Sequence, residues 1–356
     1  ENYRGLTYPR FFENMEGDLL VVLREGGHTN GKYQFAKFDG ATWTDWTDFN
    51  VLNARSQGMP HNWGLYGDMK YLHGKLRIGF HTRLSDNEDA YRLNNGFHYA
   101  YSNDPSGITQ WYNYADEAIP IPLIDYREIK FSEPANEVSS SGVNSITINR
   151  GADWTVTANE DIHFITEVIK DGDRTPVHTY KKAENQSFTT TTDFPSGSLY
   201  SIGDEIFLLN LENRRPVIYK AQGGTNEWKE IYRATSGKQF RHGNAIVEDG
   251  KLCYYLMEMG SGSAQPIWLQ VYDLGIVSST TSAPPIAMPL KAYPNPNEHG
   301  SFQLSKVVEW QVVSSTGALL LKGKGDAVDL SAFPKGVYFL RIDSAKGTAL
   351  EKIVLD

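Results

Sequence analysis

The chain has 356 residues, of which 40% are hydrophobic and 22% charged, so it is long enough for one large and one small folded domain and is not disordered by composition. Its formal net charge of −9, without a long basic run, argues against a nucleic-acid-binding protein, although a local cationic cleft could still bind a polyanion. The single cysteine, Cys253, excludes an internal disulfide and a cysteine-based metal site, and no apolar run approaches the roughly 20 residues of a membrane helix.

Up to about residue 274 the chain alternates between short apolar runs and turn residues. The apolar and aromatic residues come in runs of about five to eight, separated by Gly, Asp, Asn and Pro, which is the pattern of strands joined by tight turns. Examples are GDLLVVLREGG at residues 17–27, HGKLRIGFHTR at 73–83 and DGKLCYYLMEMG at 249–260. Helical periodicity is almost absent, so residues 1–275 are predicted to form an all-β domain.

The strand pattern itself repeats along this domain. One unit consists of an apolar strand, an Asp/Asn-Gly turn, a second strand ending in an aromatic residue, a small polar turn and a Trp. Copies lie at residues 17–46, 74–111 and 203–228, with degenerate copies at 160–190 and 241–273. A period of roughly 40–50 residues with four strands per unit predicts a β-propeller, here with about five blades. Because the chain begins inside a strand-like segment, we expect N-terminal blades to be missing from it.

The stretch SNDPSGITQW, residues 102–111, resembles the Asp-box of sialidase-like repeats. The matching positions are Ser102, Asp104, Gly107 and Trp111. The resemblance implies that the Asp side chain caps a tight turn and that the Trp packs between blades, so we expect a structural role for this motif and no catalytic one. The closing tryptophans of the two other clear repeats are Trp43 and Trp228.

A change in composition separates the propeller from a smaller C-terminal domain. Residues 276–290 are rich in Ser, Thr and Pro and are predicted to be a linker, and residues 291–356 alternate like the strands of a small β-sandwich. This segment resembles the C-terminal sorting domain of the type IX secretion system of Bacteroidota; the matching residues are Tyr293-Pro294-Asn295-Pro296, STGALL at 315–320, Gly336-Val337-Tyr338-Phe339-Leu340 and the terminal EKIVLD. The resemblance implies an exported protein, secreted or held at the cell surface, with the type IX machinery as a partner.

The densest cluster of polar and aromatic residues lies between residues 59 and 99. Inner strands come first in each repeat, and propellers bind ligands around the central channel, so this segment is expected to face a ligand. His81 and Arg83 are two residues apart on a predicted strand and share one face, where they would form a small cationic patch if that face points into the channel. Arg83 suits a structural salt bridge equally well, and Tyr66 suits the core, although its neighbouring glycines would let a ligand approach closely. The histidines lack a metal-binding spacing such as H-E-x-x-H, so no metal site is predicted.

Three stretches of the propeller region carry a family resemblance. They are LTYPRFFENMEGDLLVVLREGGHTNGKYQFAKFDGATWTDW at residues 6–46, YGDMKYLHGKLRIGFHTR at 66–83 and NNGFHYAYSNDPSG at 94–107. Residues 6–274 resemble the BNR-4-type propellers, which include ulvan lyases and related enzymes that cleave rhamnosyl-glucuronate linkages. In that family a segment with a His that is a usual catalytic candidate precedes the T-Y-P motif, and this chain lacks it. The family's N-H-D motif is also replaced here, by Asn94-Asn95-Gly96.

The resemblance implies a polysaccharide lyase that cleaves an ulvan-like polymer by β-elimination across C4–C5 of a uronic acid. Such a reaction needs a cation to neutralise the C5 carboxylate, a base to take the C5 proton and an acid to protonate the leaving oxygen. Carried over to this sequence, Arg83 is the neutralising group, Tyr66 is the acid or base, and His61 and His81 are the histidine candidates. The residues expected to bind the substrate are Asn62, Arg92, Asn94, Asn95, Tyr126, Arg241 and His242.

Two other functional classes stay open from the sequence. One is a glycoside hydrolase on the same propeller, of the rhamnosyl-glucuronate or sialidase type. A typical sialidase needs an Arg triad and a Tyr–Glu pair, and the sequence shows no such set, while the spacing of paired carboxylates cannot be read from a sequence. A non-catalytic carbohydrate-binding propeller is the third class. In each case the expected partner is an anionic polysaccharide, with no nucleic acid and no membrane-spanning segment. No cofactor is required by this chemistry, and a structural calcium or zinc ion stays open.

Overall fold

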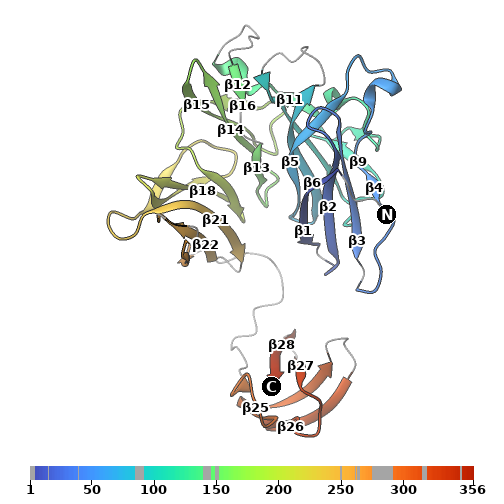
Figure 1. The fold of residues 1–356 in the computed structure, drawn as a ribbon, viewed down its shortest axis with the longest axis vertical. Helices are drawn as coiled ribbons and strands as arrows, with labels where there is room; N and C mark the ends of the chain where they lie inside the picture. Colours follow the sequence, from blue (N-terminus) through green and yellow to red (C-terminus); the bar gives the residue numbers. More distant parts are fainter. Residues whose placement is uncertain are drawn as a thin grey trace. The chain divides into compact units, whose positions relative to one another are not determined.

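The computed structural model of the protein describes residues 5–14, 16–38, 40–84, 92–138, 146–148, 152–248, 251–260, 262, 265–274, 292–314, 319–344 and 347–356 (Figure 1). The chain divides into two compact units, Glu1–Ser278 and Ser279–Asp356. The predicted linker at 276–290 lies outside the described residues, as do residues 315–318 of the STGALL stretch. The described parts of both units consist mainly of β-strands joined by turns.

The N-terminal unit is built from five sheets that, apart from the short strand β7 (Arg92–Leu93), follow one another along the chain. The first sheet contains, in spatial order, β1 (Leu6–Glu13), β2 (Leu19–Gly26), β3 (Gly31–Phe38) and β4 (Thr47–Asp48). The fourth contains β17 (Ser198–Ile202), β18 (Glu205–Glu212), β19 (Arg215–Gln222) and β20 (Lys229–Arg233). The fifth contains β21 (Phe240–Glu248), β22 (Lys251–Glu258) and β23 (Ile267–Asp273). All strand pairs in these three sheets are antiparallel, as expected for strands joined by short turns.

The second and third sheets carry additional short strands. The second contains β5 (Trp63–Leu72), β6 (Lys75–Leu84), β8 (Asn95–Ser102), β9 (Trp111–Asn113), β10 (Ala118–Ile119) and β11 (Lys130–Ser132). The third contains β7 (Arg92–Leu93), β12 (Ile146–Ile148), β13 (Asp153–Val156), β14 (Ile162–Lys170), β15 (Asp173–Lys181) and β16 (Thr189–Thr191). The helical elements of the described residues are three short 3-10 turns, η1 (Ala54–Gln57), η2 (Tyr126–Ile129) and η3 (Pro134–Glu137). None of the described helical turns has the length or apolar character needed to cross a membrane.

One strand from each of the five sheets faces a common cavity. These strands are β1, β5, β13, β17 and β21. An arrangement in which successive sheets each present an inner strand to one centre is that of propeller blades, so the predicted β-propeller is confirmed. In the three clear repeats, at residues 17–46, 74–111 and 203–228, the repeat begins at the second strand of a blade. The inner strand of that blade, β1, β5 or β17, precedes it in the chain.

The hydrophobic core of the propeller lies between neighbouring blades. Successive side chains of a strand point to opposite faces of its sheet. A blade that is covered by a neighbour on both sides therefore carries apolar side chains on both faces. Separate clusters join the first and second blades, the second and third, the third and fourth, and the fourth and fifth; their members include Phe35 with Trp63, Tyr99 with Trp154, Ile165 with Leu208, and Phe207 with Leu252. Gly79 is required at one such contact, because a Cβ there would lie 2.6 Å from the ring of Trp154.

The Asp-box turn has the structural role that its sequence predicts. The Asp104 carboxylate accepts hydrogen bonds from three backbone N–H groups of the turn, at 2.9–3.1 Å, and these bonds lower its pKa in spite of partial burial, which acts in the opposite direction. Trp111 is fully buried and donates its indole N–H to the Gly107 carbonyl at 2.7 Å. Gly107 has φ +70° and leaves no room for a Cβ, which would lie 2.5 Å from Leu76. The turn therefore ties the outer strands of the second blade to its core.

The closing tryptophans of the other two repeats differ from this arrangement. Trp228 is partly buried and packs on the cluster between the third and fourth blades. Trp43 is 45% exposed and packs its ring on Phe38, at 5.2 Å between centroids, so it does not lie between blades.

The C-terminal unit is a single described sheet with its own core. Its strands are β24 (Ala292–Tyr293), β25 (Ser301–Ser314), β26 (Leu319–Asp329), β27 (Gly336–Ser344) and β28 (Gly347–Leu355). Phe302, Leu340 and Ile353 are fully buried in it. Asn295 of the YPNP motif accepts a hydrogen bond from the Val354 N–H and donates one to the Lys352 carbonyl, so the motif is fastened to the last strand.

Candidate functional site

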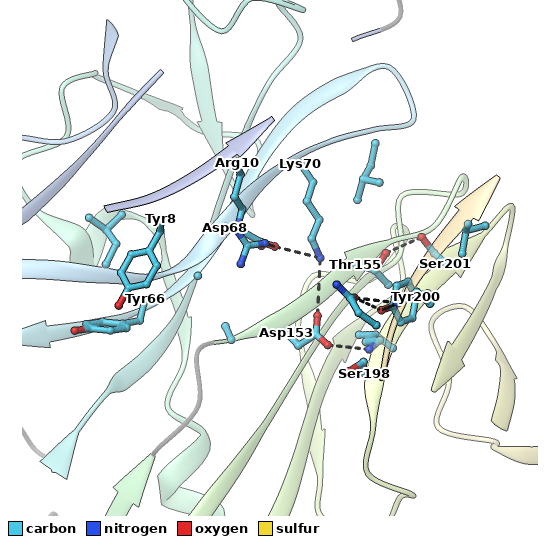
Figure 2. Close-up of a pocket in the computed structure, with 18 of the residues that line it drawn as sticks. Tyr8, Arg10, Tyr66, Asp68, Lys70, Asp153, Thr155, Ser198, Tyr200 and Ser201 are labelled. Carbon is cyan, nitrogen blue, oxygen red and sulfur yellow. Dashed lines mark hydrogen bonds and ion pairs between the residues drawn. The ribbon is translucent and has the colours of Figure 1, made fainter. Parts of the chain in front are cut away.

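The inner strands of the propeller enclose a cavity of about 720 Å³ (Figure 2). This volume falls within the usual range for small-molecule sites, roughly 300–1,000 Å³. All five blades contribute to its wall, β5 with the longest segment, residues 65–72. The cavity is therefore the candidate functional site.

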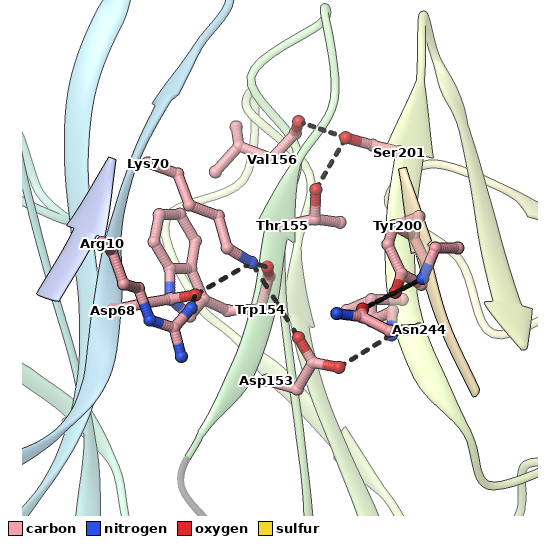
Figure 3. Close-up of polar contacts among 12 residues, drawn as sticks. Arg10, Asp68, Lys70, Asp153, Trp154, Thr155, Val156, Tyr200, Ser201 and Asn244 are labelled. Atoms are coloured by element: carbon pink, nitrogen blue, oxygen red, sulfur yellow. Dashed lines mark hydrogen bonds and ion pairs between the residues drawn. The ribbon is translucent and has the colours of Figure 1, made fainter. Parts of the chain in front are cut away.

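A row of charged side chains crosses the middle of the cavity (Figure 3). Arg10 Nη1 lies 2.7 Å from Asp68 Oδ2, and Lys70 Nζ lies 3.8 Å from the same oxygen and 3.9 Å from Asp153 Oδ1. The other oxygen of Asp68 accepts a hydrogen bond from the Trp154 indole. Burial raises the pKa of Asp153, while Lys70 acts against this rise. Two cations and two anions balance here, so this part of the cavity offers polar contacts without net charge.

Neutral hydroxyl and amide groups line the part of the cavity formed by β13, β17 and β21 (Figure 3). The Tyr200 hydroxyl accepts a hydrogen bond from the Ala245 N–H at 3.2 Å and donates to Asn244 Oδ1 at 3.3 Å. The hydroxyls of Thr155 and Ser201 are 2.6 Å apart. Burial raises the pKa of Tyr200 to about 12, so its hydroxyl is neutral at pH 7. Such paired donors and acceptors suit the hydroxyl groups of a sugar.

Tyr66 lies at the cationic end of the cavity. The centroid of its ring is 4.4 Å from the Arg83 guanidinium carbon and 5.1 Å from that of Arg24. In the β5–β6 ladder Tyr66 is opposite His81, and Arg83 lies two residues beyond His81, so all three side chains share one face of the sheet. Arg83 Nη2 also donates to Asn94 Oδ1 at 3.2 Å. The structure thus brings together Tyr66, Arg83 and Asn94 of the predicted site residues.

Arg24 belongs to this group and was missed by the sequence analysis. It is 5% exposed, and its guanidinium also lies 4.8 Å from the ring centroid of Tyr8, which lines the cavity. The available signal was an arginine inside the otherwise apolar strand LLVVLREG. A charged residue in such a strand is rarely buried unless it has a partner or a function.

His81 does not reach the cavity, contrary to the prediction of a catalytic role and of a cationic patch with Arg83. Its ring is fully buried between blades, with Nδ1 hydrogen-bonded to the Gly96 carbonyl and Nε2 3.2 Å from Thr166 Oγ1. Burial lowers the pKa of His81 to about 4, so it carries no charge at neutral pH. Both ring nitrogens are hydrogen-bonded, so His81 is a core residue. Its bond to the Gly96 carbonyl links β6 to β8.

His61 and Tyr126 lie on the opposite side of the second blade from Tyr66. Their side chains are 3.4 Å apart, and Tyr126 packs edge-on against Trp63, at 5.6 Å between centroids. Trp63 alternates to the other face of β5 from Tyr66, because the two are an odd number of residues apart on one strand. The structure therefore separates these two predicted residues from the Tyr66 group.

The remaining predicted substrate-binding residues lie in different places. Asn62 accepts a hydrogen bond from the Arg55 N–H at 2.8 Å and so supports the turn around η1. Asn95 is 6% exposed, and its carbonyl accepts from Thr82. Arg241 and His242 are exposed on β21, outside the cavity wall. The backbone of Arg92 forms β7, and its side chain is outside the described part of the chain.

Candidate metal ligands do not gather within the part of the chain that the structure describes. There, no group of three or more His, Cys, Asp or Glu side chains has a geometry suited to holding an ion. Cys253 is a partly buried free thiol on β22.

Two family models match parts of this chain. Residues 1–193, more than half of the chain, match the model of the BNR repeat-containing family. Residues 291–356 match the secretion system C-terminal sorting domain. The chain thus carries a sorting domain of the type IX route, and the protein is destined for the cell surface or the exterior.

Curated relatives and a solved structure resemble most of this chain. It is 45% identical over 297 residues to the ulvan lyase, long isoform, of Glaciecola sp. (strain KUL10), covering 81% of this chain and 29% of the relative. It is 44% identical over 285 residues to the ulvan lyase, short isoform, of Alteromonas sp. (strain LOR), covering 78% and 54%. The crystal structure of polysaccharide lyase Uly1 is similar with a TM-score of 0.72 and 39% identity, covering 76% of this chain and 58% of that one. The chain therefore spans less than two thirds of the length of each of these proteins.

Proposed function

The chain belongs to the BNR repeat-containing family, and from this premise we propose that its propeller is the catalytic part of an exported polysaccharide lyase. The proposed substrate is a uronate-containing, ulvan-like polymer, and the proposed reaction is β-elimination. Relatives named as ulvan lyases, at 42–45% identity over about four fifths of the chain, support this proposal, and so does the similarity to a solved polysaccharide lyase. The sorting domain supports a site of action outside the cell.

The observation that carries the proposal is the position of Tyr66 beside two guanidinium groups at the cavity. Arg83 and Arg24 both lie within 5.1 Å of the Tyr66 ring centroid. Elimination from a uronate needs a cation at the carboxylate and a proton-transfer group beside it, because the negative charge grows on the carboxylate as the C5 proton leaves. This end of the cavity supplies both.

We assign charge neutralisation to Arg83. Its planar guanidinium can bind both oxygens of the substrate carboxylate. The electron pair left at C5 is delocalised into this carboxylate, and the guanidinium stabilises the negative charge that results. Asn94 Oδ1, 3.2 Å from Arg83 Nη2, helps to fix the plane of the guanidinium. The interaction strengthens as charge develops, so Arg83 stabilises the transition state more than the bound substrate.

We assign proton transfer to Tyr66. Its phenol lines the cavity, whereas the ring of His81 is buried with both nitrogens hydrogen-bonded and His61 lies on the other side of the blade. A phenol can take the C5 proton or give a proton to the leaving oxygen when it lies within hydrogen-bond reach. The neutral wall around Tyr200 would hold the sugar hydroxyls and keep the scissile unit oriented.

A glycoside hydrolase is the second candidate, because two carboxylates also face the cavity. Asp68 and Asp153 both lie near Lys70, at 3.8 and 3.9 Å, and burial raises the pKa of Asp153. Hydrolysis uses such a pair, one protonated and one ionised. Against this role, both oxygens of Asp68 are already engaged, one by Arg10 and the other by the Trp154 indole.

The product distinguishes the two reactions. The protein is incubated with ulvan, and the unsaturated uronate end that elimination creates is followed by its ultraviolet absorbance, with reducing ends measured in parallel. We expect Arg83→Ala to lower kcat roughly 10²–10³-fold, Arg83→Lys to recover part of it, and Tyr66→Phe to be comparably damaging. Reducing ends without an unsaturated product, abolished by Asp68→Asn or Asp153→Asn, would overturn the lyase in favour of the hydrolase.

Fold integrity is the control for these variants. A structural Arg83, placed only to stabilise the blade, would give a lower melting temperature in Arg83→Ala with near-normal kcat in the folded fraction. The Tyr66→Phe variant removes a single hydroxyl, so its melting temperature should match that of the wild type. A near-normal kcat in either Arg83→Ala or Tyr66→Phe would remove that residue from the mechanism.

A further inference from the structure

Arg24 is a buried cation that has no counter-ion in the described part of the chain. Only 5% of the residue is exposed. Its Nε and Nη1 atoms are inaccessible to solvent, and no described residue provides a hydrogen-bond acceptor for them. Burial of a charged group without such partners is energetically expensive, so an arrangement of this kind calls for an explanation.

The acids around this part of the fold are engaged elsewhere. Asp68 of the neighbouring cavity wall pairs with Arg10 at 2.7 Å. Glu25, which follows Arg24 in β2 and points to the other face, pairs with Lys32 at 3.2 Å. Arg24 therefore keeps its positive charge and its hydrogen-bonding capacity for a group that is not part of these residues.

The space around Arg24 is shaped for its side chain. A Cβ at Gly31 would lie 3.1 Å from Arg24 Cδ and 2.6 Å from the Gly27 carbonyl oxygen, so glycine at this position makes room for the arginine stem. The guanidinium then lies against two aromatic rings, with its central carbon 4.8 Å from the Tyr8 centroid and 5.1 Å from the Tyr66 centroid. The guanidinium therefore lies beside Tyr8 and Tyr66, the two tyrosines that line this end of the cavity (Figure 2).

Tyr8 is an exposed cover over this cation. The residue is 59% exposed and has φ +55°, a left-handed conformation that a bulky side chain seldom adopts. It lies on β1, the edge strand of its sheet, at an irregularity of register between Thr7 and Arg10. A ring that is exposed, strained and carried by an edge strand can move aside with little loss of packing.

We propose that Arg24 is a second oxyanion receptor of the cavity, which binds a carboxylate or sulfate of the polysaccharide when Tyr8 moves aside. Arg24 and Arg83 contact the same ring, so their two anions belong to one sugar unit or to adjacent units. This inference rests on one part of the proposed function, namely that the ligand is an anionic polysaccharide. It predicts that the propeller recognises the spacing of two negative groups, one of which takes no part in bond breaking.

A purely structural role would leave the observation unexplained. Aromatic faces attract a guanidinium, but they do not accept the hydrogen bonds that its edge donates in its own plane. An oxyanion with two oxygens can accept both of the hydrogen bonds that this edge donates, as a bidentate pair.

The test measures binding of the polymer by calorimetry, in a Tyr66→Phe background so that the polymer is not consumed. Three probes are used: ulvan, ulvan with its carboxyl groups reduced, and ulvan treated to remove sulfate esters. We expect Arg24→Gln to weaken binding of untreated ulvan by roughly tenfold or more. On the treated polymer that lacks the group held by Arg24, Arg24→Gln and its parent should bind with equal affinity. Equal affinity for carboxyl-reduced ulvan identifies the group as a carboxylate, and equal affinity for desulfated ulvan identifies it as a sulfate.

A matched control removes an arginine whose charge is already compensated. Arg174 lies on β15, with its side chain 58% exposed and 2.8 Å from Glu167, so Arg174→Gln changes the net charge equally and should leave affinity within about twofold of the parent. Affinity for ulvan unchanged by Arg24→Gln, or weakened equally on all three polymers, would overturn the proposal. If Arg24→Gln does not fold, Arg24→Lys serves, because it keeps the charge and loses the planar fork; unchanged affinity there also overturns the proposal.

The two proposals fail separately. If the wild type yields no unsaturated uronate while Arg24→Gln still weakens binding of one polymer selectively, the lyase is wrong and the receptor stands. If the wild type yields that product and Arg24→Gln binds like its parent, the receptor is wrong and the lyase stands.

Discussion

Acid should destabilise the propeller through a buried pair of histidines in its third blade. His163 and His178 are both fully buried, and their Nδ1 and Nε2 atoms are 3.0 Å apart. His163 Nε2 accepts from the Gly224 N–H, so His163 Nδ1 must donate to His178 Nε2. His178 Nδ1 then donates to Asn226 Oδ1 at 2.8 Å. Every ring nitrogen has a partner only while both histidines are neutral.

The size of the effect follows from the pKa of His178. Burial lowers this pKa to about 4, whereas the unfolded chain has the ordinary value of about 6.5. Between pH 6.5 and about pH 4 the unfolded chain binds a proton at His178 and the folded chain does not. The free energy of unfolding is therefore highest above pH 6.5 and decreases as the pH falls through this window. The loss amounts to roughly 3 kcal/mol over the whole window, of which roughly 2 kcal/mol is reached by pH 5. Burial also lowers the pKa of His163, which adds to the same trend.

The measurement is urea unfolding at pH 7, 6 and 5, followed by tryptophan fluorescence. Seven of the eight tryptophans lie before residue 278, so the signal reports mainly on the propeller. The informative variant is His178→Gln, because the amide offers one acceptor to His163 and one donor to Asn226 without titrating. We expect the decrease in the free energy of unfolding between pH 7 and pH 5 to be smaller in this variant by roughly 2 kcal/mol.

An exposed histidine provides the control. His242 is exposed on β21, and replacing it breaks none of the hydrogen bonds of the buried pair, so His242→Gln should show the same decrease between pH 7 and pH 5 as the wild type. Equal decreases in the wild type and in His178→Gln would show that the buried pair does not set the acid sensitivity, and the reasoning from its hydrogen bonds would be wrong.

Three further predictions concern the architecture. Asp104→Ala should lower the free energy of unfolding by about 2 kcal/mol, because three turn N–H groups lose a charged acceptor, while kcat per folded molecule stays the same; a loss of kcat without a loss of stability would contradict this. Limited proteolysis should cut near residues 276–290 and release two folded pieces, and cuts within the repeats before the linker would count against two independent units. Deletion of residues 291–356 should abolish secretion and leave the propeller and its activity intact, so normal export of the shortened chain would refute the role of the sorting domain.

The blade architecture was predictable because its signals are local. Period-2 apolar runs, glycine turns and a repeated closing tryptophan all follow from the geometry of one strand or one turn. Tyr66 and Arg83 were recognisable through the family resemblance, and the register of β5 and β6 places both on one face of the sheet. Trp43 shows the limit, because the Trp at this closing position is 45% exposed and packs on Phe38, whereas Trp111 is fully buried.

The parts that could not be predicted depend on neighbouring blades. The partners of His81 are a carbonyl on β8 and the Thr166 hydroxyl on β14, and neither is near it in sequence, so its neutral buried state was hidden. The burial of Arg24 depends on Tyr8 from β1 and Tyr66 from the next blade. His61 precedes β5 in a loop, where no periodicity shows which side of the blade it occupies.

The division of labour within each blade has an evolutionary consequence. The cavity wall is drawn from short segments of five inner strands, whereas the Asp-box turn and its buried Trp111 lie at the outer strands of the second blade. Substitutions can therefore accumulate in the inner strands and change the sugars that are bound, while the blade packing is preserved. Descendants of one ancestral propeller should share the Asp-box and its buried tryptophan and diverge first at positions such as 8, 68, 153 and 244.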